Sequence, residues 1–248
     1  MGVNVPSPNE LRGRVIIMAN ENWKPLSDLC EKVPCMDDNR LKTRQLNEVS
    51  SLSEPQLHKM LKSSDDLLIS ATKKRLVRVY PGGHRQLSGN FSPVPALNAG
   101  IQLVALNHQT KDENLELLNC VFREAGDTGF ALKPGILING SQSVPGKRIS
   151  IEILEESIPK NHSVSLKVFE GLKKVTTTTL KKGKKTELQV NTPELAYLIF
   201  KLKKRKFFGL RNATKGCMAI PVTNLLEGER EFELSYATIK INVKIQNL

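Results

Sequence analysis

The stretch from Arg75 to Thr110, RLVRVYPGGHRQLSGNFSPVPALNAGIQLVALNHQT, decides the fold of the first half of the chain. It opens as a strand, because Leu76 to Tyr80 are mostly β-branched, aliphatic or aromatic and the run stops at a Pro-Gly-Gly turn. A second apolar run, Ile101 to Asn107, is typical of a strand buried on both faces. Two such strands with a long connection predict a parallel α/β unit.

Arg78 and Tyr80 lie two positions apart in the first of these strands, so we expect them to share one face near its C-terminal end. Parallel barrels keep their active sites at the carboxyl ends of their strands. An Arg in an apolar strand at that end is a candidate anion clamp, because its planar guanidinium matches the geometry of phosphate. The alternative interpretation makes Arg78 an ion-pair partner and Tyr80 a core-filling residue.

Three consecutive motifs, Arg-x-Tyr-Pro-x-Gly-x-Arg, Ser-x-Asn-Phe-x-Pro and Asn-x-Gly-x-Gln-x-Val-Ala-Leu-Asn-x-Gln-Thr, resemble the Y half of the catalytic barrel of phosphoinositide-specific phospholipase C. The matching positions are Arg78, Tyr80, Pro81, Gly83, Arg85, Ser88, Asn90, Phe91, Pro93, Asn98, Gly100, Gln102, Val104, Ala105, Leu106, Asn107, Gln109 and Thr110. The chain departs from the family pattern at Leu87-Ser88, where the family has Asp-Ser, and at Leu97, where it has Trp.

Residues 6–18 resemble the last strand of the X half of the same barrel, with a Pro-Ser-Pro lead and a strand from about residue 14. The resemblance implies two downstream lysines that hold the ring phosphates of the substrate, but Met18 and Asn20 stand at those positions and carry no charge. The next barrel strand should lie within Cys30 to Arg40. Because that segment contains Pro34, which a central strand does not tolerate, we expect an irregular element there.

Ser51-Leu52-Ser53-Glu54 precedes a predicted helix from Gln56 to Lys62, and either Ser could serve as the helix N-cap. The family resemblance implies a different role for Ser51, which is donation to a phosphate on the inositol ring. The same resemblance assigns Arg78 to that phosphate and Tyr80 to the face of the inositol. Ser51, Arg78 and Tyr80 are therefore the predicted substrate-binding residues.

The resemblance continues through a helical segment, Asn114 to Phe122, and a predicted last barrel strand, Gly129 to Pro134, and it ends near Ile138. Residues 139–146, NGSQSVPG, predict a linker. The expected organisation is an end of the X box plus the Y-box half of a TIM barrel over 1–138, the linker, and a second domain over 147–248.

Beyond the linker the hydrophobic period changes to two, which predicts eight short strands and an antiparallel β-sandwich. The strands are expected near Ile149–Ile153, Val164–Val168, Val175–Leu180, Leu188–Val190, Tyr197–Leu202, Met218–Val222, Phe232–Leu234 and Ile239–Ile245. Its position after the Y half resembles the C2 domain that closes these lipases. The predicted fold class is α/β plus all-β, an incomplete TIM barrel followed by a C2-type sandwich.

The net charge of +12 is concentrated in the second domain, where 20 Lys and Arg against 10 Glu leave 20 − 10 = +10. Calcium-binding C2 domains gather several Asp carboxylates, and residues 147–248 contain no Asp. We therefore expect no calcium in this domain, and no cofactor or metal site in the chain, although the family reaction uses calcium.

Two basic clusters are candidate contacts with an anionic membrane, since each Lys or Arg near such a surface contributes about 1 kcal/mol. They comprise Lys181, Lys182, Lys184, Lys185, Lys203, Lys204, Arg205 and Lys206, followed by Phe207 and Phe208, which could insert into the membrane. The alternative is a pair of solvent-facing turns. Phosphoinositides and anionic membranes, rather than nucleic acid, are the predicted ligands.

The chain has no apolar run of the roughly 20 residues needed to span a bilayer. Its four cysteines, Cys30, Cys35, Cys120 and Cys217, form no CxxC pair, so we interpret them as reduced thiols. These features predict a cytoplasmic protein that is peripheral at membranes.

In the family, two histidines act as base and acid, and Asn, Glu and Asp side chains hold calcium, while the inositol 2-hydroxyl attacks phosphorus. All of these residues belong to the X half before Pro6, so the resemblance implies no catalytic residue in this sequence. One hypothesis is a C-terminal portion of a phosphoinositide phospholipase C-like signalling protein that needs an X-half polypeptide and is inactive alone. The other is a non-catalytic phosphoinositide- or membrane-binding module. In either case we expect an open sheet before Ile138 that is unstable or oligomeric alone, and a sandwich from about Lys147 that folds independently.

Overall fold

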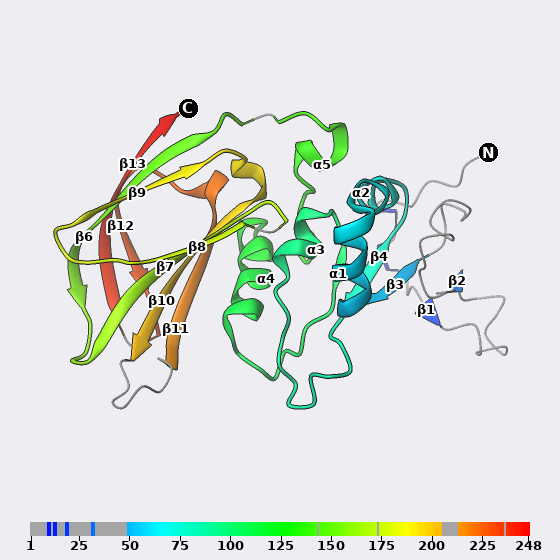
Figure 1. Ribbon diagram of the computed structural model, residues 1–248, viewed down its shortest axis with the longest axis horizontal. Helices are drawn as coiled ribbons and strands as arrows, with labels where there is room; N and C mark the ends of the chain where they lie inside the picture. The colour runs from blue at the N-terminus through cyan, green and yellow to red at the C-terminus, as the bar shows by residue number, and fades with distance from the viewer. Residues whose placement is uncertain are drawn as a thin grey trace. The chain divides into compact units, whose positions relative to one another are not determined.

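The structure is a computed structural model that describes residues 9–10, 12–13, 18–19, 31–32, 49–142, 144–172, 174–204, 213–235 and 237–248 (Figure 1). The chain divides into two compact units. The first comprises residues 1–91 and 96–110, and the second comprises residues 92–95 and 111–248.

The first unit contains a parallel three-stranded sheet with the order β3-β4-β5. Helix α1 packs on β3 and β4 and also contacts α2 (Figure 1). In chain order the elements up to the end of this unit are β1 (Met18–Ala19), β2 (Glu31–Lys32), β3 (Ser50–Ser53), α1 (Glu54–Ser63), α2 (Asp65–Lys74), β4 (Val77–Tyr80), α3 (Val94–Asn98) and β5 (Leu103–Val104).

The predicted strand around Arg78 is β4, and it pairs in parallel with β5 as expected. The second strand is much shorter than predicted, since only Leu103–Val104 is extended in the sheet and both residues are half-buried. The side chain of Gln102 explains the late start, because its Oε1 accepts from the Val77 backbone N–H at 3.0 Å. The Gln102 side chain thus takes the hydrogen-bonding position at which the backbone ladder between β4 and β5 would otherwise begin.

Two other predicted strands differ in the structure. In the segment from Cys30 to Arg40 the structure describes one two-residue strand, β2, which pairs in parallel with β1, and the rest lies outside the described residues. Residues 129–134, predicted as the last barrel strand, form no strand and leave Phe130 and Leu132 exposed. A strand requires a neighbour for its backbone groups, and none of the described residues pairs with this segment.

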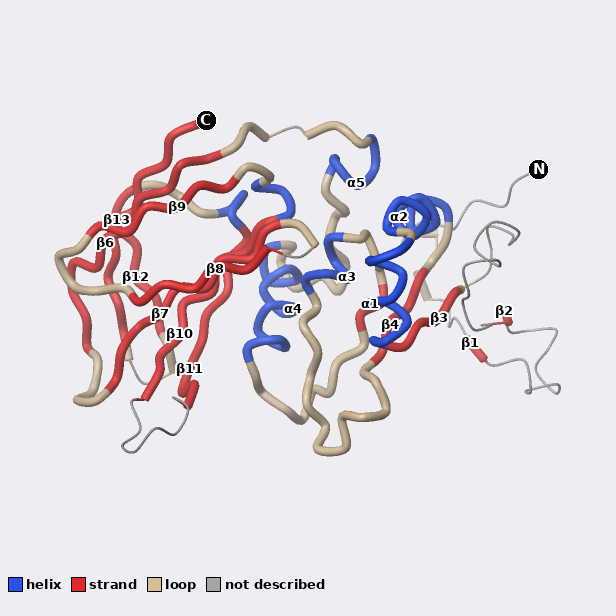
Figure 2. The backbone as a smooth tube through the Cα atoms, viewed as in Figure 1, coloured by secondary structure: helices blue, strands red, loops and turns tan. Residues whose placement is uncertain are grey.

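The second unit contains two four-stranded antiparallel sheets with the orders β11-β10-β7-β8 and β12-β13-β6-β9 (Figure 2). Its eight strands lie where the period of two predicted them. The elements are α4 (Glu113–Glu124), α5 (Gly135–Asn139), β6 (Lys147–Ser157), β7 (His162–Glu170), β8 (Lys174–Thr179), β9 (Lys185–Val190), η3 (Pro193–Leu195), β10 (Ala196–Lys204), β11 (Ala213–Pro221), η4 (Val222–Asn224), β12 (Gly228–Glu233) and β13 (Thr238–Asn247).

The core of the sandwich consists of the alternate residues that each strand turns toward the opposite sheet. Ile149, Ile151 and Ile153 from β6 are each 1% exposed or less. The rings of Phe200 and Phe232 meet in this core with their centroids 5.0 Å apart. Two facing sheets of this kind fit a C2-like sandwich.

Helix α4 belongs to the sandwich unit, although the family resemblance predicts it as part of the barrel half. It packs on β11 and β10 and buries Leu117 and Cys120 completely. Its first residue, Glu113, accepts from Lys167 of β7 at 3.0 Å and from Lys201 of β10. The continuous part of the second compact unit therefore begins at Lys111, whereas the predicted second domain begins after the linker at 139–146.

Candidate functional site

Alternation along two parallel strands brings the three predicted substrate-binding residues to one face of the first unit. Strands β3 and β4 align Ser51 with Arg78 and Ser53 with Tyr80. All four of these residues are half-buried, whereas the intervening positions are fully buried against the helix side of the sheet. The half-buried face therefore carries hydroxyl groups, a guanidinium and a phenol near the carboxyl ends of parallel strands.

Arg78 contacts both of its predicted companions. Its Nη1 donates to Ser51 Oγ at 3.2 Å, and its Cζ lies 5.1 Å from the centroid of the Tyr80 ring. No carboxylate among the described residues pairs with Arg78, so the ion-pair alternative has no partner within that part of the chain. Because a guanidinium has five N–H donors, this arrangement leaves donors for an anion.

The N-cap of α1 is Ser53, so Ser51 does not have the capping role. The Ser53 N–H donates to Gln56 Oε1 at 2.8 Å, which is the reciprocal contact of a capping box. Ser51, three positions before the first residue of the helix, instead accepts from Arg78. Both serines of the motif thus have distinct local roles.

A buried ion pair joins the start of α1 to the loop after β4. Glu54 is 4% exposed and accepts from Arg85 Nε and Nη2 at 2.6 Å each, and also from the Gly82 N–H at 3.2 Å. The Arg85 hydrogen bond lowers the pKa of Glu54 against the opposing effect of burial. The more exposed His84 lies 3.9 Å from the same carboxylate.

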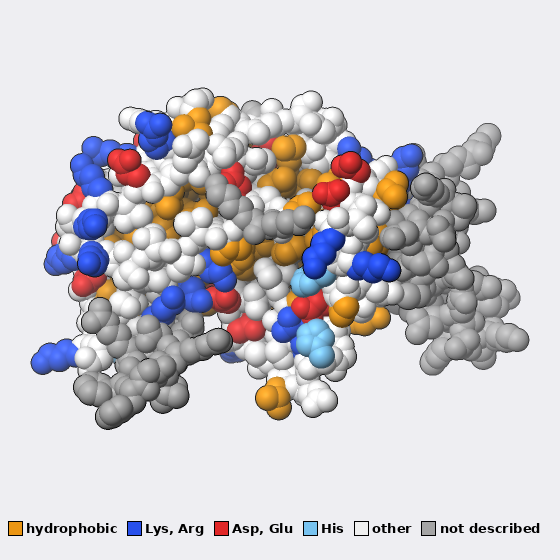
Figure 3. Space-filling view, viewed as in Figure 1, with side chains coloured by type: hydrophobic (Ala, Val, Ile, Leu, Met, Phe, Trp, Pro, Cys, Tyr) orange, Lys and Arg blue, Asp and Glu red, His pale blue; other side chains and the backbone are white. Residues whose placement is uncertain are grey.

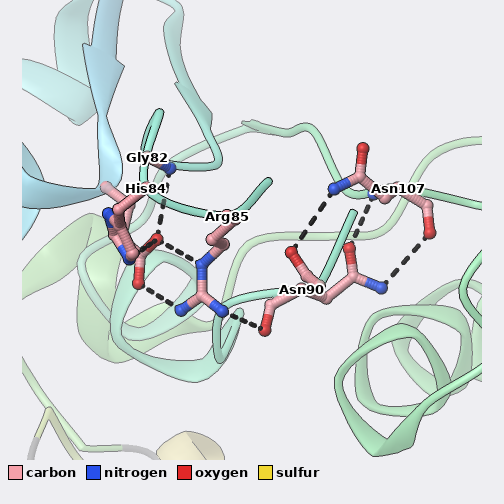
Figure 4. A network of polar contacts seen from close by, with 7 residues as sticks. Gly82, His84, Arg85, Asn90 and Asn107 are labelled. Atoms are coloured by element: carbon pink, nitrogen blue, oxygen red, sulfur yellow. Dashed lines mark hydrogen bonds and ion pairs between the residues drawn. The ribbon is translucent and has the colours of Figure 1, made fainter. Parts of the chain in front are cut away.

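The same network extends to the loop after β5 (Figure 4). Arg85 Nη1 donates to the Asn90 carbonyl at 3.0 Å, and Asn90 Oδ1 accepts from the Asn107 N–H at 2.7 Å. Asn90 Nδ2 donates to the Asn107 and Thr110 carbonyls. These contacts fix two loops that leave the carboxyl ends of β4 and β5. In the sequence, Arg85, Asn90, Asn107 and Thr110 stand out only as positions that match the family pattern, with no predicted role.

The basic turn in the second unit, Lys181 to Lys185, is exposed at all five positions. The turn closes through the Lys184 N–H, which donates to the Lys181 carbonyl at 3.1 Å, with Gly183 at a φ of +69° between them. The Gly183 N–H also donates to Ile153 of β6. The lysines are therefore displayed from an anchored turn, on a unit whose surface carries many Lys and Arg side chains (Figure 3).

The structure describes only part of the second basic cluster, residues 203–208. Lys203 and Lys204 lie within β10, where Lys203 is half-buried and Lys204 exposed. Burial and the neighbouring Lys201 lower the pKa of Lys203. Arg205, Lys206, Phe207 and Phe208 lie outside the described residues. Within the described part of the chain, no helix has the length and apolar character to cross a membrane.

Comparison with known proteins gives a family match that covers most of the first unit and extends through α4 of the second. Residues 24–136 match the family described as phosphatidylinositol-specific phospholipase C, Y domain. The human 1-phosphatidylinositol 4,5-bisphosphate phosphodiesterase eta-2 is 34% identical over 119 residues, covering 47% of this chain and 8% of that protein. The pig zeta-1 enzyme of the same name is 40% identical over 97 residues, covering 39% of this chain and 15% of that protein.

Longer matches include the second unit. The human delta-3 phosphodiesterase is 28% identical over 235 residues, covering 80% of this chain and 30% of that protein. The crystal structure of L. pealei PLC21 superimposes with a TM-score of 0.81 at 21% identity, covering 99% of this chain and 40% of that one. The chain thus spans well under half the length of each of these relatives. The Y-domain match, these relatives and the structural superposition together support a phosphoinositide phospholipase C C-terminal region.

Proposed function

We propose that this chain is the substrate-holding and membrane-facing C-terminal portion of a phosphoinositide phospholipase C-like protein, and that it does not hydrolyse the lipid by itself. The observation that carries the proposal is the contact of Arg78 with Ser51 and Tyr80 on one half-buried face. Its ligand would be the phosphorylated inositol ring of phosphatidylinositol 4,5-bisphosphate, the substrate in the names of the relatives.

The chemistry of the three side chains suits such a ring. The guanidinium of Arg78 supplies a planar pair of donors to a phosphate, and the Ser51 hydroxyl adds a short-range donor beside it. The Tyr80 ring offers an apolar surface for the C–H face of inositol, with the phenol available for a hydroxyl. The Glu54–Arg85 pair and the Asn90 contacts hold the loops on either side, which reduces the ordering that binding would require.

The partner in this proposal is an X-half polypeptide, in the same protein or separate. We interpret β3, β4 and β5 as part of half a TIM barrel, whose half-buried polar face would be turned to the barrel interior. The X half would supply the general base, the general acid and the calcium ligands of the family reaction. This chain would supply binding and orientation.

A second candidate function is membrane binding without catalysis. It is favoured by the anchored display of Lys181, Lys182, Lys184 and Lys185 on the second unit. Four lysines near an anionic leaflet would contribute several kcal/mol, which exceeds what a single phosphate contact offers. The two functions are compatible, because the substrate-holding role rests on residues of the first unit and the membrane contact on residues of the second.

Titration calorimetry with inositol 1,4,5-trisphosphate tests the substrate-holding role. We expect the R78K variant to bind inositol trisphosphate about tenfold more weakly, because Lys keeps the positive charge but lacks the planar pair of N–H donors of a guanidinium. R148K is the matched control, since Arg148 is exposed on β6, and it should bind as the wild type does. Equal affinities for R78K and wild type would contradict the assignment of Arg78.

An assay for released inositol trisphosphate tests the absence of hydrolysis. The purified chain should give the same rate as a buffer blank with calcium present, and full-length relatives serve as positive controls. Calcium-dependent release by this chain above the blank would disprove that part of the proposal.

Liposome co-sedimentation tests the membrane contact. Binding should rise with phosphatidylserine content, weaken as salt screens the charges, and remain unchanged by a calcium chelator. Replacing Lys182 and Lys184 by Gln should weaken binding by about 30-fold, while K62Q on the exposed part of α1 should leave it unchanged. Loss of binding with the chelator would contradict the proposed basis of attachment.

A further inference from the structure

Strand β8 is an edge strand of the sandwich that carries four consecutive threonines. It pairs with β7 and ends the sheet order β11-β10-β7-β8. The register aligns Thr177 with Lys167 and Thr179 with Ser165. Because side chains alternate across a strand, Thr177 and Thr179 share the face of Lys167, whereas Thr176 and Thr178 share the opposite face with the core residue Leu166.

The outer-face threonines are accessible. Thr177 and Thr179 are both exposed, as is Thr176 on the opposite face, and all three lie on an already extended backbone. Only Thr177 and Thr179 lie on the face that carries Lys167. Threonine suits an edge strand for its β-branching and polarity alone, which accounts for the residue type. This preference for edge strands does not account for the lysines that flank the four threonines.

From Lys174 to Lys185 the chain has five Lys and no Asp or Glu. Lys174 stands three positions before Thr177, and the exposed lysines of the basic turn begin two positions after Thr179. An exposed hydroxyl on an extended segment with lysines on both sides is complementary to an enzyme cleft with an acidic peptide-binding surface.

We propose that Thr177 and Thr179 are acceptor sites for a protein kinase that selects basic substrates, and that their phosphorylation weakens the attachment of the basic turn to anionic membranes. In the reaction, Thr Oγ1 attacks the γ-phosphorus of a nucleoside triphosphate. The new O–P bond forms as the bond to the nucleoside diphosphate breaks, and the hydroxyl proton passes to a carboxylate of the kinase.

The effect follows from charge. Each phosphate adds about −1.5 to −2, so two phosphates cancel most of the positive charge between Lys174 and Lys185. A phosphate on Thr177 also lies beside Lys167, which already donates to Glu113 of α4. This inference rests on the proposed membrane contact of the same turn.

The first experiment locates the phosphate. The full chain is incubated with ATP and either protein kinase C or the cAMP-dependent protein kinase, and the sites are mapped by mass spectrometry. We expect phosphate on Thr177 or Thr179, lost in the T177V/T179V variant and retained in the matched inner-face variant T176V/T178V. No phosphate on β8 with either kinase, or phosphate confined to Thr176 and Thr178, overturns the proposal.

The second experiment measures co-sedimentation with vesicles of phosphatidylcholine and phosphatidylserine. We expect the phosphorylated protein to bind about tenfold or more weakly, and T177E about fivefold more weakly. T223E places the same charge on the exposed residue Thr223 of η4 and should change binding less than twofold.

The two experiments separate the two proposals. If the unmodified protein fails to bind vesicles, the proposed membrane contact is disproved, and so is its proposed regulation by phosphorylation. If the unmodified protein binds and the phosphorylated protein binds equally well, the membrane contact stands and the regulatory inference is overturned.

Discussion

Two arginine side chains of the first unit, Arg78 and Arg85, differ in what they contact. Arg78 has a hydroxyl and an aromatic ring as neighbours, while Arg85 makes a bidentate pair with the buried Glu54. The two arginines come from one motif, seven residues apart, yet only Arg85 has a carboxylate partner among the described residues. A buried carboxylate without a partner is costly, so Arg85 is required for the loop whether or not a ligand is present.

Replacing Glu54 by Gln should lower the free energy of unfolding by about 2 to 3 kcal/mol at neutral pH. The folded pKa of Glu54 is depressed, so its contribution is complete above the pKa of the unfolded chain and is lost as pH falls through the lower folded value. Urea unfolding at neutral and acidic pH checks this. The difference between wild type and E54Q should shrink in acid, and a constant difference would contradict the ion-pair account.

The control for this measurement is Glu233, which is exposed on β12 and has no partner among the described residues. E233Q should change the free energy of unfolding by no more than about 0.5 kcal/mol.

At the scale of elements, β11 passes very close to the turn after β12. A Cβ at Gly216 would lie 2.7 Å from the Leu234 carbonyl oxygen and 2.5 Å from Ser235 Oγ. Because the first of these atoms is backbone, it cannot rotate away. Gly216 is therefore needed for the packing of two strands from different sheets.

We expect G216A to lower the free energy of unfolding by about 1 to 3 kcal/mol, since the added methyl group forces a backbone shift. G83A is the matched change, because a Cβ at Gly83 meets no atom within 4 Å. Thermal unfolding of both variants gives the comparison. A loss in G83A as large as that in G216A would indicate that the contact is not the cause.

At the scale of the whole molecule, the compact units do not coincide with the boundary that the linker suggests. Helix α4 lies before residues 139–146 but is held to the sandwich by Glu113, by Glu116 through the Ala219 N–H at 3.3 Å, and by buried leucines. Attachment is decided by the surface a helix buries, and chain order does not specify that surface.

A chain shortened to begin at Lys111 should therefore unfold cooperatively and be more stable than one that begins at Lys147, by about 3 kcal/mol or more. The loss in the shorter chain arises because β10 and β11 expose the surface that α4 covers and leave Lys167 and Lys201 without Glu113. Denaturant unfolding of both chains provides the measurement. Equal stabilities would show that α4 contributes nothing to the second unit.

The sequence by itself determined the eight strands of the sandwich, the parallel pairing around Arg78 and the shared face of Arg78 and Tyr80. These features depend on periodicity and on neighbours close in the chain, which a single sequence displays. The tertiary structure alone decided that Ser53 rather than Ser51 caps α1, that Gln102 shortens β5, that residues 129–134 form no strand and that α4 joins the sandwich. Each of these four features depends on contacts between residues far apart in the chain or on competition between nearby side chains for one hydrogen-bonding group. Composition and spacing alone do not show which of the competing contacts forms.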